Sequence, residues 1–271
     1  MISSPLRYPG GKGRLYDIVK QIMQDGNFMN RTYVEPFAGG FGIGIRLLTN
    51  HDVDSIIIND ADRHIYAFWH CVFFDTQNFV ELIRSTDITL ENWDVQKNIY
   101  NYDNEATVLE LGFSAFFLNR TNYSGVLSGG PIGGRKQDGK YALGCRYNRE
   151  DLAHRIEMLG QYRNQVEVYN YDAIEFIDRI VLPRAGQLFV NFDPPYVKKG
   201  PVLYRNYYSK EDHVNLAQHI QQHMANAQWI MTYDDCQIIR QLYERYQPEQ
   251  INLMHFAGRA KMGKELLIKN V

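Results

Sequence analysis

The chain has 271 residues, enough for one large α/β domain or for a core with an inserted module. Hydrophobic residues make up 45% of it and charged residues 22%, which excludes a disordered chain, and no apolar run is long enough to span a membrane. The net charge of −2 does not by itself indicate a nucleic-acid-binding protein. The N-terminal sequence MISSPLRYPGGKGRL lacks the apolar segment of a signal peptide, and the three cysteines form no CxxC pair. We therefore expect a soluble, cytoplasmic protein with reduced thiols and no metal site.

Short apolar runs alternate with helical patterns over most of the chain. Each run has the length of a strand and is apolar at nearly every position, as in a parallel sheet covered by helices on both faces. The last two runs are separated only by the basic stretch 259–264, which predicts a loop and an antiparallel hairpin at the end of the sheet. The predicted strands are residues 32–37, 55–60, 165–170, 187–192, 228–233, 251–256 and 265–270. The predicted helices between them are a short one ending at Leu48 and residues 61–74, 211–225 and 236–246.

Residues 74–159 interrupt this alternation. They contain one helical stretch, EATVLELGFSAFFLNR at 105–120, followed by a segment rich in glycine and cations. Long irregular segments in compact proteins are usually functional or disordered. Between Leu118 and Arg149 the only acid is Asp138, and the cations, which suit contacts with phosphates, are Arg120, Arg135, Lys136, Lys140, Arg146 and Arg149. We predict one domain made of residues 1–73 and 160–271, with an inserted, mainly helical lobe at 74–159.

Two glycine-containing sequences are candidates for ligand binding. VEPFAGGFG, residues 34–42, joins a predicted strand to a predicted helix, and Asp60 ends the next strand about twenty residues after this turn, where an acid can accept hydrogen bonds from ribose hydroxyls. This arrangement fits NAD or another cofactor containing adenosine; the alternative for Asp60 is a cap of the following helix. RYPGGKG, residues 7–13, lacks the GxxxxGK[ST] spacing of a phosphate-binding loop, which argues against ATP and leaves a flexible turn as the alternative.

The sequence QLFVNFDPPY leads from an apolar strand directly into a carboxylate, two prolines and a tyrosine. The prolines end regular pairing, so Asp193 and Tyr196 lie on a stiff loop at the carboxyl end of a strand, where ligands bind in open α/β sheets. The carboxylate of Asp193 and the carbonyl of Pro194 can accept both hydrogens of an aromatic amino group and so free its lone pair. Tyr196 offers a face for stacking a flipped base. The alternative is a strand-terminating turn with a packed tyrosine.

Taken together, these motifs resemble the DNA N6-adenine methyltransferases of the Dam-like, D12 class. The resemblance covers almost the whole chain, through RYPGGKGRL, VEPFAGGFG, IIIND, FFLNRTNYSGV, VYNYDAIEFI, FDPPY and ELLIKN in this order. It implies a Rossmann-like class I methyltransferase sheet in residues 1–73 and 160–271, which would bind S-adenosyl-L-methionine. It also implies that the lobe at 74–159 recognises the target DNA.

The resemblance implies specific roles for residues that match these motifs. Asp60 matches the acid that binds the ribose, and Asp172 matches the acid that binds the adenine amino group of the cofactor. One position departs from the family pattern, because Phe41 replaces the glycine expected two residues after Gly39, which leaves the path of this loop open. The implied cofactor-binding residues are Tyr8, Lys12, Glu35, Pro36, Phe37, Gly39, Asp60 and Asp172. The implied catalytic residues are Asp193, Pro194, Pro195 and Tyr196.

The segment NRTNYSG is similar to the family segment that approaches DNA. Asn119 and Arg120 begin it, and Tyr123 stands where an aromatic residue wedges beside the target base. Ser124 replaces an asparagine common in the family, so base preference cannot be carried over; the alternative for Arg120 is an ion pair at a helix end. A later run mixes cations and aromatic rings that suit a displaced base, or that form a solvated loop, namely Lys198, Lys199, Tyr204, Arg205, Tyr207 and Tyr208.

The sequence thus predicts a site-specific DNA adenine-N6 methyltransferase that transfers the methyl group of S-adenosyl-L-methionine directly to a flipped adenine. No Pro-Cys dipeptide is present for cytosine-C5 chemistry, and the PCxxC pair of a zinc deaminase is absent. The alternatives are an RNA or protein-amide N-methyltransferase, a catalytically silent DNA-binding relative, and a Rossmann dehydrogenase. Double-stranded DNA is the predicted partner, and a cognate restriction endonuclease is compatible with the resemblance. The sequence leaves the oligomeric state open, with a monomer favoured.

Overall fold

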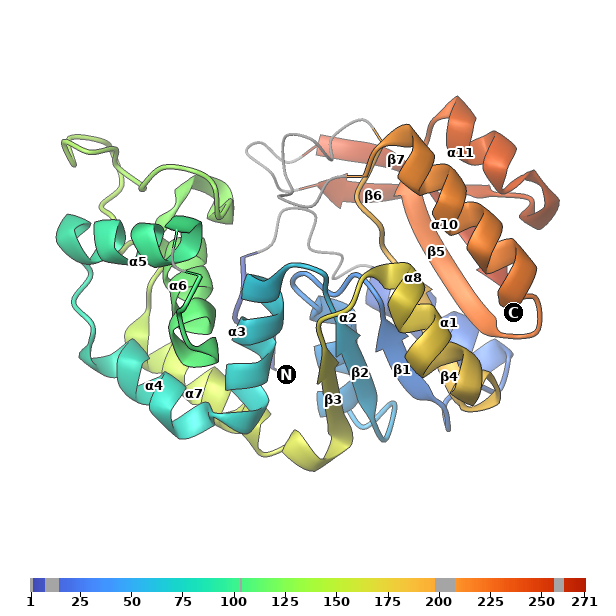
Figure 1. Ribbon diagram of the computed structural model, residues 1–271, viewed down its shortest axis with the longest axis horizontal. Helices are drawn as coiled ribbons and strands as arrows, with labels where there is room; N and C mark the ends of the chain where they lie inside the picture. The colour runs from blue at the N-terminus through green and yellow to red at the C-terminus, as the bar shows by residue number, and fades with distance from the viewer. Residues whose placement is uncertain (1, 8–14, 103, 198–207, 256–260) are drawn as a thin grey trace.

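The computed structural model describes residues 2–7, 15–102, 104–197, 208–255 and 261–271. Its centre is a seven-stranded sheet in the order β3-β2-β1-β4-β5-β7-β6 (Figure 1). Strands β1 to β5 are parallel, and β7 is antiparallel to both of its neighbours, β5 and β6. The strands are β1 (Thr32–Glu35), β2 (Ile56–Asn59), β3 (Val166–Tyr169), β4 (Leu188–Phe192), β5 (Gln228–Asp234), β6 (Glu249–His255) and β7 (Lys261–Asn270). The predicted α/β fold, with a mostly parallel sheet and a C-terminal hairpin, is confirmed.

Strand β7 begins earlier than the sequence predicts. Lys261 pairs with His255 and Met262 with Met254, so the part of the expected basic loop from Lys261 to Lys264 belongs to the strand. The ladder with β6 satisfies the backbone groups of these residues, which favours a strand over a loop.

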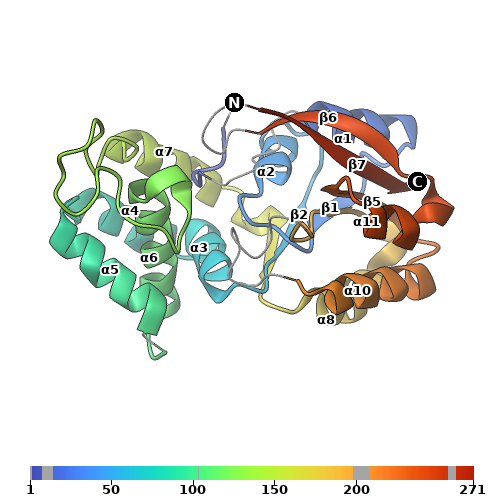
Figure 2. The same cartoon turned by 90° about the horizontal axis from the view of Figure 1, so that it is seen from above.

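Helices cover both faces of the sheet. Because neighbouring residues of a strand point to opposite faces, Tyr33 and Phe189 belong to one buried cluster, while Val34 and Val190 belong to another. The first cluster includes side chains of α1 (Leu15–Asp25), α2 (Gly42–Thr49) and α3 (Arg63–Phe74). The second includes side chains of α8 (Ala173–Phe176), α10 (Lys210–His223) and α11 (Gln237–Leu242). Figure 2 shows α1 and α2 on one side of the sheet and α8 and α10 on the other.

Residues between α3 and β3 form a helical lobe beside the sheet (Figure 1, left). Its helices are α4 (Thr76–Ser85), α5 (Leu90–Tyr102), α6 (Val108–Thr121) and α7 (Arg149–Gly160). The helix predicted at 105–120 is confirmed as α6, which starts at a capping box formed by Thr107 and Glu110. The lobe shares its core with the sheet, since Phe116 stacks on Phe68 of α3 at 6.0 Å between ring centroids.

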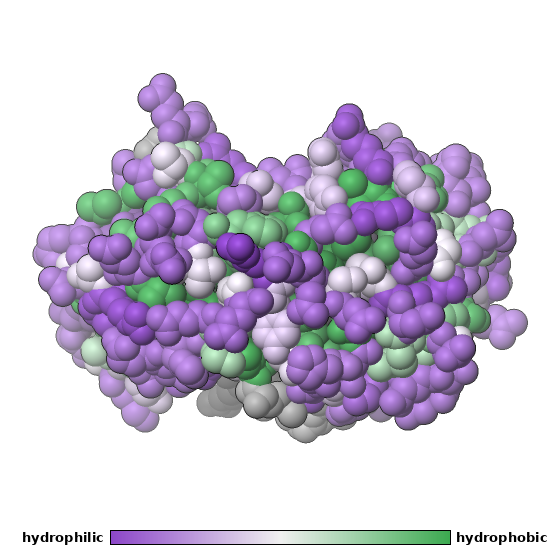
Figure 3. Space-filling view, turned by 90° about the horizontal axis from the view of Figure 1, so that it is seen from below, coloured by the Kyte–Doolittle hydropathy of each residue, from purple (hydrophilic) through white to green (hydrophobic). Residues whose placement is uncertain are grey.

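The sequence analysis did not identify α4, α5 and α7 in the lobe, nor α1 and the short α8 beside the sheet. For α7 the signal was present, since Leu152, Ile156 and Leu159 are buried at helical spacing. Among the described residues, no helix combines the length and the apolar character needed to cross a membrane. The face in Figure 3 is predominantly hydrophilic, with apolar residues in small groups.

Candidate active site at the carboxyl edge of the sheet

Four acidic residues lie where neighbouring parallel strands end. Glu35 is the last residue of β1, and Asp60 and Asp193 come directly after β2 and β4. Asp172 lies in the connection from β3 to α8. Since the strands are ordered β3-β2-β1-β4, their carboxyl ends form one edge, and the acids occupy it in the order Asp172, Asp60, Glu35, Asp193. This is the edge at which ligands bind in open α/β sheets.

A buried asparagine, which the sequence analysis did not single out, connects the carboxyl ends of β1, β2 and β3. The side-chain amide of Asn59 donates to the carbonyl oxygens of Pro36 at 2.9 Å and of Tyr171 at 3.1 Å. Its side-chain oxygen accepts from the backbone N–H of Tyr171 at 2.9 Å. Asn59 is fully buried, so these bonds are protected from water and fix the loops after β1 and β3 relative to the end of β2.

The glycine turn after β1 follows an unusual path at Phe41. Gly39 and Phe41 both have positive φ, 46° and 45°, which is uncommon for a bulky residue such as phenylalanine. The Phe41 ring is 1% exposed and packs against Tyr33 and Trp69, with ring centroids 6.3 and 5.9 Å away. A Cβ on Gly44 would come within 2.2 Å of this ring, so the helix leaves room for it. Burial of the ring therefore holds a backbone conformation that glycine would adopt without strain.

Asp60 binds the same turn from the next strand. One carboxylate oxygen accepts from the backbone N–H of Gly39 at 2.8 Å, and the other accepts from the N–H of Asp62 at 2.9 Å. Desolvation, and then the nearby charge of Asp62, raise the pKa of Asp60 to about 7. The N-cap of α3 is Asp62, whose side chain accepts from His64 N–H, so the alternative that Asp60 caps this helix is wrong. Each oxygen of Asp60 keeps acceptor capacity for a further hydrogen bond.

Two aromatic rings pack against each other just after the end of β1. The rings of Phe37 and Tyr208 meet edge to face, with centroids 5.7 Å apart. Burial, followed by the charges of Asp172, Asp212 and Asp60, raises the pKa of Tyr208. Asp172 is exposed and caps α8 by accepting from Ile174 N–H at 2.9 Å. The edge thus combines acceptors for hydroxyl and amino groups with apolar faces.

Neighbouring strands hold the DPPY sequence in place. Thr232 of β5 donates its hydroxyl to the Asp193 carboxylate at 3.3 Å. Asp234, at the end of the same strand, accepts from the backbone N–H of Val197 at 3.0 Å. Pro194 is buried, and Tyr196 is partly buried against the second core cluster. The loop is therefore bound to β5 on both sides of the prolines.

A buried chain of hydrogen bonds connects β4 to the end of β1. Asn191, two residues before Asp193, donates to the Tyr33 hydroxyl at 2.8 Å, and Tyr33 donates to Glu35 at 2.6 Å. Desolvation, followed by the charge of Glu35, raises the pKa of Tyr33 far above its usual value. The tyrosine hydroxyl therefore stays protonated and remains a donor to Glu35.

Comparison with known proteins agrees with this geometry. A sequence model of the D12 class N6 adenine-specific DNA methyltransferase family matches residues 8–256. The chain belongs to this family. It is also similar to the type II methyltransferase M.MjaIII of Methanocaldococcus jannaschii, with 23% identity over 206 residues, which cover 70% of this chain and 68% of the relative. The predicted family and DNA adenine methylation as its activity are confirmed.

In this methyltransferase, the first residue of NRTNYSG is buried and the second is only partly exposed. Asn119 is 1% exposed, and its side chain accepts from Arg7 N–H at 2.7 Å and donates to the carbonyl oxygens of Arg7 and Gly125 at 2.8 and 3.0 Å. Arg120 is partly exposed, and desolvation, followed by the charges of Arg7 and Arg155, lowers its pKa to about 10. Within the part of the chain that the structure describes, no carboxylate forms an ion pair with Arg120, contrary to the alternative of a helix-end pair.

Tyr123 and Ser124, the fifth and sixth residues of this sequence, are exposed and partly exposed, respectively. Tyr123 is 71% exposed, and Ser124 beside it has a φ of 55°, in the left-handed region. They belong to a loop of residues 122–131, here called the target loop, whose ends meet through a bridge between Asn122 and Pro131. The structure thus places Asn119 beneath the target loop and Tyr123 on its surface.

Some predicted site residues lie outside the described ranges. Among the cofactor-binding predictions these are Tyr8 and Lys12, and among the cations and rings of the later run they are Lys198, Lys199, Tyr204, Arg205 and Tyr207.

Proposed function

We propose that this chain is a site-specific DNA adenine-N6 methyltransferase that uses S-adenosyl-L-methionine and acts on an adenine flipped out of the duplex. The observation that carries the proposal is the position of Asp193, which follows β4 at the same edge as Glu35, Asp60 and Asp172 and is fixed by Thr232. An adenosine-containing methyl donor along this edge would lie beside a base held by the DPPY loop.

The residues present fit this cofactor. Among the described residues, each oxygen of Asp60 accepts one backbone N–H, which leaves lone pairs for two ribose hydroxyls. Phe37 and Tyr208 provide apolar faces, and Asp172 provides an acceptor for an amino group. The residues proposed to bind the cofactor are Tyr8, Lys12, Glu35, Pro36, Phe37, Gly39, Asp60 and Asp172.

When bound, the cofactor supplies a methyl group activated by a sulfonium ion. The protein orients the acceptor: the Asp193 carboxylate and the Pro194 carbonyl each accept one hydrogen of the adenine amino group, which localises the lone pair on N6. Tyr196 stacks on the flipped base, and Pro195 keeps the loop extended. N6 held in this way would attack the methyl carbon directly: the N–C bond would form as the carbon–sulfur bond breaks, its electron pair would stay on the neutral thioether sulfur, and N6 would release a proton to solvent. No covalent enzyme intermediate is formed.

For the lobe, we propose that residues 74–159 recognise the target DNA and that residues 1–73 and 160–271 form the catalytic domain. Tyr123 and Ser124 would contact the duplex directly. Arg120 would bind DNA through its positive charge, whereas Asn119, being buried, would act by fixing Arg7 and Gly125. By analogy with the type II relative, the enzyme would modify the site of a restriction endonuclease. It would work as a monomer in the cytoplasm, where its DNA substrate is.

The test is methyl transfer by the purified protein. The protein is incubated with S-adenosyl-L-methionine carrying a labelled methyl group and, separately, with duplex DNA, RNA and protein substrates. We expect label in N6-methyladenine from DNA, confined to one sequence context. Label found only in RNA or only in protein amides would contradict the proposal, as would binding of DNA with no transfer at all.

A further inference from the structure

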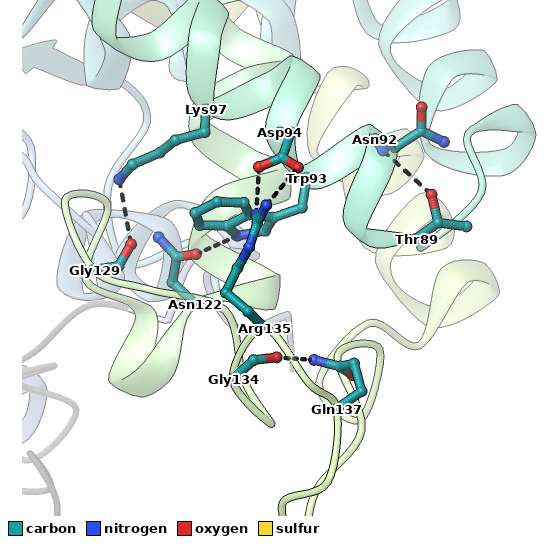
Figure 4. Close-up of polar contacts among 10 residues, drawn as sticks. All are labelled: Thr89, Asn92, Trp93, Asp94, Lys97, Asn122, Gly129, Gly134, Arg135 and Gln137. Carbon is teal, nitrogen blue, oxygen red and sulfur yellow. Dashed lines mark hydrogen bonds and ion pairs between the residues drawn. The ribbon is translucent and has the colours of Figure 1, made fainter.

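Helix α5 binds the target loop along one side. Trp93 and Lys97 lie one helical turn apart and so share a face of this helix. The Trp93 indole N–H donates to the side-chain oxygen of Asn122 at 2.7 Å. The Lys97 ammonium donates to the carbonyl oxygen of Leu127 at 2.9 Å and to that of Gly129 at 3.2 Å. Figure 4 shows the bonds from Lys97 to Gly129 and from Trp93 to Asn122. The sequence analysis assigned no role to either residue.

The setting of Lys97 is unusual for a lysine. Its ammonium lies 5.7 Å from the centre of the Trp93 ring and 5.5 Å from that of Tyr100, and burial lowers its pKa. No carboxylate among the described residues forms an ion pair with it. The partners of this half-buried charge are therefore two backbone carbonyls and two aromatic faces. Such a position is costly unless the bonds to the loop are made, so the charge and the folded loop stabilise each other.

Asn122 connects the other part of the loop to the same helix. Its amide group donates to the carbonyl oxygens of Val126 and Leu127 at 2.8 and 3.0 Å while its oxygen binds Trp93. The backbone N–H of Tyr123 donates to Gly130 at 3.0 Å and closes the loop. These side chains occupy the interior of the loop and leave the Tyr123 side chain outside, 71% exposed.

We propose that Lys97 is a positioning residue for DNA recognition: through Leu127 and Gly129 it holds the target loop in the conformation that presents Tyr123 to the duplex. This inference rests on the proposed function of the lobe. Ordering a loop during binding lowers affinity, so a loop that is already fixed lets Tyr123 meet the DNA without that cost.

The test compares three variants. Lys97→Met removes the charge and the donors but keeps the length, and Lys97→Arg restores both. Lys140→Met removes the same charge from an exposed lysine of the same lobe whose ammonium lies over the Tyr141 ring. Amide hydrogen exchange is measured on the free protein, and KM for DNA, KM for cofactor and the salt dependence of DNA binding are measured with duplex substrate.

For Lys97→Met we expect faster exchange at the amides of residues 123–130 and a KM for DNA raised about tenfold, the loss of about one net hydrogen bond to a charged group. The KM for cofactor and the salt slope should not change, and Lys97→Arg should recover most of the loss. In Lys140→Met, exchange in the target loop should match that of the unmodified protein.

Three outcomes would overturn the proposal: unchanged exchange in Lys97→Met, faster exchange without a change in KM for DNA, and a salt slope reduced by about 0.9. The last would identify Lys97 as a direct phosphate contact instead. If Lys97→Met does not fold, Lys97→Arg is used instead. Faster amide exchange in the target loop of the folded Lys97→Arg variant would then contradict the proposal. If the unmodified protein transfers no methyl group to DNA, the proposed function fails. The exchange data still show whether Lys97 holds the target loop.

Discussion

Replacing Asp60 by asparagine tests whether its buried carboxylate titrates near pH 7 and binds the proposed cofactor. Burial raises its pKa to about 7 from 3.8, so between these values the folded protein keeps a proton that the unfolded chain has released. Unfolding therefore releases a proton, and the free energy of unfolding decreases as the pH rises from about 4 to about 7. Above this window the whole penalty of the buried charge is present.

The size of the effect follows from the shift. About three pKa units at 1.36 kcal/mol each give about 4 kcal/mol, and because the residue is partly accessible to solvent, screening reduces this to about 2 kcal/mol. Asp60→Asn removes the titration. It also loses one of the two bonds from Gly39 and Asp62, since an amide has one oxygen, which costs about 1–3 kcal/mol at every pH.

The assay is urea unfolding at pH 5 and pH 8. At pH 5, Asp60→Asn should have a lower free energy of unfolding than the unmodified protein. At pH 8, the free energy of unfolding of the variant relative to the unmodified protein should be higher than at pH 5 by about 2 kcal/mol. Asp87→Asn, on an exposed residue of the lobe, is the control and should show no such movement. Cofactor affinity, measured by calorimetry, should increase with pH in the unmodified protein and be about tenfold lower and flat in Asp60→Asn. A stability difference that stays constant between the two pH values would refute the reasoning.

Three further substitutions test the turn, the DPPY loop and the target loop. Phe41→Gly should lower the free energy of unfolding, measured in urea, by about 2–4 kcal/mol, because loss of a buried ring costs about 3–5 kcal/mol and relief of the positive φ returns about 1 kcal/mol. Phe74→Ala is the control, since Phe74 is 46% exposed. An unchanged stability of Phe41→Gly would contradict the packing role. Asp193→Ala should leave cofactor affinity within about threefold, with methyl transfer reduced by orders of magnitude; retained turnover would remove Asp193 from its role. Tyr123→Ala should leave stability unchanged within about 0.5 kcal/mol but weaken DNA binding about tenfold, by loss of stacking, and unchanged affinity and site choice would count against the lobe assignment.

Much of the fold could be read from the sequence because burial leaves a local pattern. The apolar runs of the parallel strands, the prolines after Phe192 and the glycines after Phe37 are all local signals. Each predicted strand overlaps an observed one, although β7 begins at Lys261 and not at 265. Once the strands are parallel, their ends share one edge, so the row of acids from Asp172 to Asp193 follows from topology. The sequence alone therefore determined the fold class and indicated the edge of the sheet at which we propose the active site.

The tertiary structure decided how the loops are held. Asn59 binds Tyr171 and Asn119 binds Arg7 across 112 residues of sequence in each case, and Lys97 reaches Gly129 across 32. No local pattern marks these side chains, because a polar residue in a sequence looks the same whether it meets water or a distant carbonyl. The left-handed turn at Phe41 likewise depends on Tyr33 and Trp69, which only the packed sheet brings together. Secondary structure and burial are encoded by neighbours in the chain, whereas the partners of a buried polar group are chosen by the folded surroundings.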